Sequence, residues 1–77
     1  MNQADFQKTA ADIREICFRI EKLTRETGDE VEDLGDMPAS VHKLNIFKET
    51  GREYCRNLRE LSNELGTAIV RLNAVCQ

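Results

Sequence analysis

Hydrophobic residues recur every three or four positions along the first third of the chain. In order they are Phe6, Ala10, Ile13, Ile16, Cys17, Ile20 and Leu23. Because an α-helix turns once every 3.6 residues, this spacing places them on one helix face. We expect a helix over residues 4–27 that ends at Gly28, since glycine readily adopts the conformation that terminates helices. The same spacing continues at Val31 and Leu34, so the alternative is a helix that runs through Gly28.

The second half of the chain carries a longer and more regular row with coiled-coil-like spacing. Its members are Leu44, Phe47, Gly51, Tyr54, Leu58, Leu61, Leu65, Ala68, Leu72 and Val75. Steps of three and four residues alternate over about four heptads, which is typical of a packed helix. We expect a helix over residues 39–75. Pro38 suits its first turn, and Ser40 is an alternative cap.

An acidic connector, residues 28–38, separates the two predicted helices. It holds five acidic residues and no basic one, together with Gly28, Gly35 and Pro38, which favour a turn. A calcium-binding EF-hand loop requires oxygen ligands at its third position and glycine at its sixth. Counted from Asp29, those positions are Val31 and Leu34. We therefore expect a solvated connector and no metal site.

Two helices and one connector predict a single all-α domain, an antiparallel hairpin spanning residues 1–77. A turn near Met37 would place residues opposite each other when their numbers sum to about 74. Ile20 would then face Tyr54, and Cys17 would lie near Cys55. The apolar rows are broad, as in helices that touch two neighbours, so we expect two hairpins to form a four-helix bundle. The predicted core and dimer residues are Ile13, Ile16, Ile20, Leu23, Leu44, Phe47, Tyr54, Leu58, Leu61, Leu65 and Leu72.

Composition and charge narrow the classes of function. The 77 residues are 32% charged with a formal net charge of −3, which disfavours a general nucleic-acid binder because such proteins neutralise phosphates. No apolar run approaches the roughly 18 residues of a membrane span. Residues 1–6 lack the basic-then-apolar order of a signal peptide. We expect a cytoplasmic protein without a membrane segment.

Three cysteines, Cys17, Cys55 and Cys76, cannot all pair within one chain. In a reducing compartment, Cys17 and Cys55 are expected to be small buried hydrophobes of the core. A Cys17–Cys55 disulfide joining the two helices is the alternative. It requires β-carbons within about 4.5 Å of each other.

Phe18 is the candidate anchor for a partner protein. It lies opposite the apolar row of its own helix and is surrounded by basic residues, and aromatic residues in such settings often anchor interfaces. Ile46 and Val70 also fall outside the row of their helix and would extend the surface. The predicted partner-binding residues are Phe18, Arg14, Lys22, Arg25, Ile46 and Val70.

The sequence favours a non-enzymatic interaction protein, an adaptor or inhibitor that regulates a larger protein. No cofactor motif and no nucleophile–base set is visible, and the single histidine, His42, lies near the start of the second helix. We expect a protein partner, a homodimer and no cofactor. A small dimeric RNA-binding hairpin is a weaker alternative.

The outline of the hairpin resembles the small helical proteins exported by type VII secretion systems. That resemblance implies an exported protein or a chaperone that masks an apolar helix. Members of that group carry Trp-x-Gly at the turn and a later Tyr-x-x-x-Asp/Glu signal. Here the turn reads Leu34-Gly35-Asp36, and Tyr54 is followed four residues on by Leu58. The resemblance therefore covers the outline and neither motif.

Overall fold

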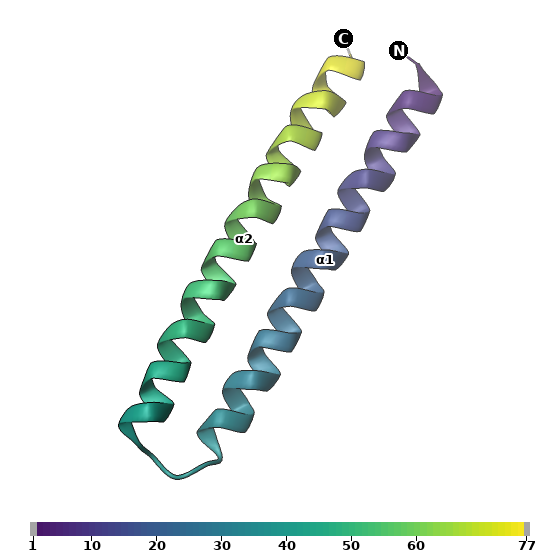
Figure 1. The fold of residues 1–77 in the computed structure, drawn as a ribbon. Helices are drawn as coiled ribbons and strands as arrows, with labels where there is room; N and C mark the ends of the chain where they lie inside the picture. Colours follow the sequence, from purple (N-terminus) through teal and green to yellow (C-terminus); the bar gives the residue numbers. More distant parts are fainter. Residues whose placement is uncertain (1, 77) are drawn as a thin grey trace.

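The protein is an all-α hairpin of two long helices that pack side by side (Figure 1). A computed structural model describes residues 2–76, in which α1 spans Gln3–Gly35 and α2 spans Val41–Val75. The helices run antiparallel, and both ends of the chain lie at the end opposite the connector. The molecule measures 58 × 15 × 9 Å. The predicted fold class, two packed antiparallel helices, is confirmed.

Side-chain caps define where each helix begins. The Asn2 side-chain oxygen accepts hydrogen bonds from the backbone N–H groups of Ala4 and Asp5, at 3.0 and 3.3 Å. Ser40 Oγ accepts a hydrogen bond from the Lys43 N–H at 3.1 Å. These caps satisfy backbone donors that have no partner within the first turn of a helix. Ser40 is therefore the cap of α2, and Pro38 precedes the helix instead of lying in its first turn.

The predicted break at Gly28 is wrong, because α1 continues without interruption to Gly35. No glycine among the described residues has a positive φ. Glycine inside a helix costs about 1 kcal/mol relative to alanine. The apolar spacing that continues through Thr27 and Leu34, both half-buried, outweighs that cost. The connector is only residues 36–40, so most of the acidic residues predicted to lie in a loop belong to the last turns of α1.

The core is a narrow seam between the helices. Its buried apolar members are Ile16, Leu61 and Ala68, with 7%, 8% and 0% of their surface exposed. Thr9 and Lys43 are also buried in it. The other predicted core residues are half-buried: Ile13, Ile20, Leu23, Phe47, Tyr54, Leu58, Leu65 and Leu72.

Leu44, one of the predicted core and dimer residues, lies at the edge of the seam, and 52% of its surface is exposed in the hairpin. One helix contacts a single neighbour along one line, which is narrower than the apolar row of either helix. The edge of the row, where Leu44 lies, therefore remains open.

The register of the hairpin also differs from the prediction. Side chains join the helices at Asp12 with Arg71 and at Arg19 with Glu64, whose numbers sum to 83. The Thr24 and Tyr54 hydroxyl groups, whose numbers sum to 78, lie 3.0 Å apart. The predicted sum was 74, and the longer α1 moves the bend to residues 36–40. Consequently Tyr54 lies level with Thr24 rather than with Ile20.

All three cysteines are free and exposed, so the predicted burial of Cys17 and Cys55 is wrong. The register explains why no disulfide joins this pair. Cys17 lies two residues from Arg19, which contacts Glu64, whereas Cys55 adjoins Tyr54, which contacts Thr24. The two thiols are thus about two helical turns apart along the hairpin.

Candidate protein-interaction surface

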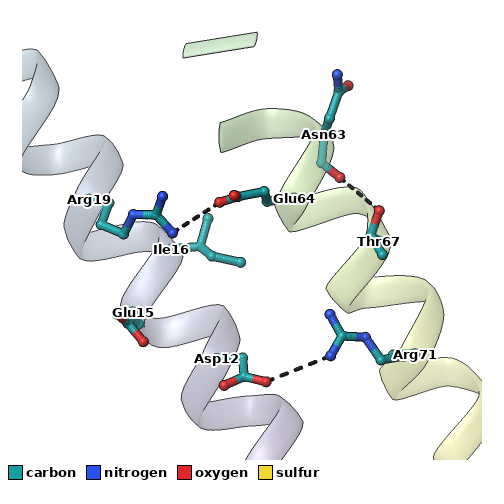
Figure 2. A pocket seen from close by; sticks show the side chains of 8 residues that line it. All are labelled: Asp12, Glu15, Ile16, Arg19, Asn63, Glu64, Thr67 and Arg71. Carbon is teal, nitrogen blue, oxygen red and sulfur yellow. Dashed lines mark hydrogen bonds and ion pairs between the residues drawn. The ribbon is translucent and has the colours of Figure 1, made fainter. Parts of the chain in front are cut away.

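One side of the hairpin is a charged groove. Figure 2 shows it lined by Asp12, Glu15, Ile16, Arg19, Asn63, Glu64, Thr67 and Arg71. Arg19 Nη1 lies 3.0 Å from Glu64 Oε2, and Arg71 Nη1 lies 3.8 Å from Asp12 Oδ2. These four side chains are each 40–59% exposed, and exposed ion pairs contribute at most about 1 kcal/mol each. The groove charges therefore compensate one another across the two helices and help to set the register.

The groove also shows which residues lie on the opposite side. Along both helices, the groove charges come three positions after a buried seam residue: Arg19 after Ile16, and Glu64 after Leu61. Residues one or four positions after a seam residue lie on the other flank of a helix. The same offsets apply to α1 and α2, because the charged residues three positions after the seam residues of both helices meet in the groove.

The side opposite the groove is a continuous apolar face contributed by both helices. We define the apolar face as Phe6, Ala10, Ile13, Cys17, Ile20 and Val31 of α1, with Leu44, Phe47, Leu58, Leu65, Ile69 and Leu72 of α2. Val31, Leu44 and Ile69 are 43%, 52% and 51% exposed. Cys55, one position after Tyr54, joins the same flank of α2. The face runs along both helices, and its side chains are half-buried or exposed within the hairpin.

Phe18, predicted to anchor a partner, is 61% exposed. It lies half a turn from the buried side of α1, on the outer edge of the hairpin. Arg14 and Lys22, one turn before and after it, are exposed as well, as is Arg25. Lys22 is engaged with Glu26, with Nζ to Oε1 at 3.9 Å.

The structure does not bring Ile46 and Val70 to the Phe18 surface, which corrects that part of the prediction. Val70 is 70% exposed on the outer edge of α2, the far side of the hairpin from Phe18. Ile46 is half-buried and comes three residues after Lys43, on the groove side. The predicted partner surface therefore reduces to Phe18 with its basic neighbours.

Lys43 is a feature that sequence reasoning missed. Only 8% of it is exposed, and its Nζ is buried with no hydrogen-bond partner among the described residues. Lysine usually marks a solvent-facing position. The spacing could have indicated this burial. Lys43 precedes Leu61 by 18 residues, or five full helical turns, so both residues lie on the same side of α2.

The remaining features of the chain do not point to another kind of site. Within residues 2–76, no three His, Cys, Asp or Glu side chains converge to hold a metal ion. Neither of the two described helices is apolar over the length that a bilayer span requires. His42 is exposed in the first turn of α2. No family model matches the chain, and neither does any curated protein or solved structure.

Proposed function

We propose that this chain is a non-enzymatic protein–protein interaction module, an adaptor or inhibitor that contributes two helices to a larger helical assembly. The observation that carries the proposal is the apolar face, which extends along both helices on one side of the molecule. A broad apolar stripe is typical of a helix that packs against two neighbouring helices. Each helix here carries such a stripe but has only one neighbour within the hairpin. The second neighbour is supplied by another protein chain.

The total surface of the hairpin supports the need for that neighbour. Its accessible surface is 6032 Å² for a mass of 8.8 kDa. A compact monomer of this mass exposes about 4,800 Å². The radius of gyration is 17.6 Å, compared with about 11.5 Å for a compact chain of this length. The hairpin leaves about 1,200 Å² more in water than a self-contained fold does.

Dimerisation into a four-helix bundle is the assembly that covers the apolar face without any other component. The outer edge around Phe18 would then remain available for a larger protein. The basic neighbours of Phe18, Arg14 and Lys22, favour a partner surface with acidic groups around an apolar pocket.

Two neighbouring residues provide a matched test of the apolar face. Ile69 and Val70 are both β-branched and mostly exposed, but Ile69 lies on the apolar face and Val70 on the outer edge. We expect Ile69→Glu to abolish the rise of the melting temperature with protein concentration, because it would bury an unpaired charge in the assembly. Val70→Glu should retain that rise. Circular dichroism melts over a hundredfold concentration range measure both.

The result that would refute the proposal is a wild-type melting temperature independent of concentration, together with a cooperative, fully helical monomer. Phe18→Ala tests the second surface. It should leave helicity and melting temperature unchanged and weaken capture of a larger partner once that partner is known. Unfolding of the Phe18→Ala variant would show instead that the ring supports the hairpin.

A secretion-linked hairpin, either an exported protein or a chaperone, is the alternative that the same apolar face supports. It predicts poor folding alone and stable folding with a partner encoded by a neighbouring gene. An RNA-binding hairpin finds less support, because the charged groove carries Asp12, Glu15 and Glu64 beside its arginines, and carboxylates repel phosphates.

A further inference from the structure

We propose that a second copy of this chain covers the apolar face, with α1 of each copy lying along α2 of the other and both connectors at the same end. This proposal rests on the proposed function and specifies the partner and its orientation. It requires a two-fold axis parallel to the helices, so that every residue keeps its height along the bundle.

The exposed area matches what a stable dimer needs. If each copy covers its excess of about 1,200 Å², the dimer buries about 2,400 Å² in total. Permanent homodimer interfaces bury about 2,000–5,000 Å². The hairpin therefore exposes an excess of the size that a second copy of itself removes.

The charges that flank the apolar face are complementary in this orientation. Beyond the face, the flank of α1 carries Arg14, Glu21 and Glu32, and the flank of α2 carries Lys48 and Arg59, all exposed. Arg14 is level with the uncharged Gly66 of the partner subunit, so the charges that meet across the interface are those of the other four residues. The cross-helix contacts place residues at equal height when their numbers sum to about 80. Glu21 then lies beside Arg59 of the partner subunit. Glu32 lies beside Lys48 of the partner subunit. The two-fold axis repeats both pairs.

At these heights, each of two levels inside the interface between α1 and α2 of the partner subunit holds at least one small side chain. Ala10 is level with Ile69 of the partner subunit, one of the most exposed apolar residues of the face. Near the middle, Cys17 is level with Ser62 of the partner subunit. Small residues at this point allow the helices to approach closely, as interdigitated packing requires.

The alternative orientation pairs like helices and places the connectors at opposite ends. In that arrangement α2 lies along α2 of the other copy, and its basic flank of Lys48 and Arg59 meets itself. Like charges at such flanking positions disfavour a helix pairing. The proposed orientation brings two acidic connectors to one end instead. Those acids are solvated, and charges farther apart than about 8 Å are largely screened at physiological salt.

Cross-linking through a new cysteine distinguishes the two orientations. We would introduce Ser62→Cys into a chain in which Cys76→Ser removes the terminal thiol. After mild oxidation, the proposed orientation yields a dimer linked between Cys17 and the thiol at position 62, identified by mass spectrometry of the peptides. A link between Cys55 and position 62 would overturn the proposed orientation, because those positions are level only when α2 lies along α2.

A matched control uses Asn63→Cys in the same Cys76→Ser chain. Position 63 points away from the apolar face, so this variant should yield no dimer linked through Cys17. Within one hairpin, Cys17 and position 62 both point out of the plane of the helices. Helix axes 8–10 Å apart keep their β-carbons beyond the reach of a disulfide.

The mass of the reduced protein separates failure of this proposal from failure of the proposed function. A poorly folded monomer would overturn the second copy as partner and leave the interaction module intact, awaiting a different chain. A stable, cooperative monomer at every concentration would overturn both.

Discussion

Leucine-to-alanine substitutions at Leu61 and Leu44 separate burial inside one hairpin from burial between two copies. Leu61 is 8% exposed and lies in the seam, whereas Leu44 is 52% exposed on the apolar face. Complete burial of the atoms that alanine lacks is worth about 2.4 kcal/mol, from three methylenes at about 0.8 each. Scaled by buried fraction, Leu61→Ala should cost about 2.2 kcal/mol of unfolding free energy, and Leu44→Ala about 1.1 in an isolated hairpin.

Coverage by a second copy raises the expected cost of Leu44→Ala and leaves the cost of Leu61→Ala unchanged. In the proposed dimer Leu44 lies level with residues 35–36 of the partner subunit, at the end of the interface, and complete coverage there would raise the cost of its substitution to about 2 kcal/mol per chain. The assay is urea unfolding followed by circular dichroism at two protein concentrations a hundredfold apart. Leu44→Ala should lose more stability at the high concentration, and Leu61→Ala should lose a similar amount at both. A Leu44→Ala cost that stays at about 1.1 kcal/mol or less at both concentrations would refute coverage of the face at Leu44.

Three further substitutions test individual features of the hairpin. Gly28→Ala should raise the unfolding free energy by about 1 kcal/mol, since nothing lies within 4 Å of the added methyl group; a loss, measured by urea unfolding, would indicate a helix break there. Ser40→Ala should lower it by about 1 kcal/mol through loss of the α2 cap, and an unchanged urea midpoint would show that the cap is dispensable. Lys43→Met should raise the melting temperature, because it removes an unpartnered buried ammonium and keeps the aliphatic stem; a lower melting temperature would show that Nζ reaches a favourable partner in solution.

The sequence predicts the class of fold because helix periodicity is a local property of the chain. Alternating steps of three and four residues defined both helices, and Ser40 was one of two candidate caps. The end of α1 was misplaced because Gly28 is a strong local signal for a stop. The apolar spacing on either side of it, which packs against α2, overrides that signal.

Burial could not be predicted from periodicity, because it depends on how many neighbours a helix has. Cys17 and Leu44 belong to the apolar rows, yet both are exposed, since one partner helix covers only part of each row. Lys43 shows the converse: it is a charged residue, yet it is buried in the seam because it lies on the same side of α2 as Leu61. Phe18 lies outside the row, as predicted, because its position opposite the apolar row of α1 follows from helix geometry alone.

The register of the two helices could not be predicted from the sequence, because it depends on the position of the bend. The sums of facing residue numbers exceed the predicted sum by four to nine, and this shift moves Cys17 away from Cys55. It also changes which charges oppose one another, and the proposed pairing of Glu21 with Arg59 follows only once the cross-helix contacts together fix the levels.

Coverage of the apolar face by a second copy determines the mass of the protein in solution. We would measure light scattering after gel filtration, in the presence of reductant, over a range of protein concentrations. We expect a helical, cooperatively unfolding species of twice the 8.8 kDa chain mass. A folded species of 8.8 kDa at all concentrations would contradict it.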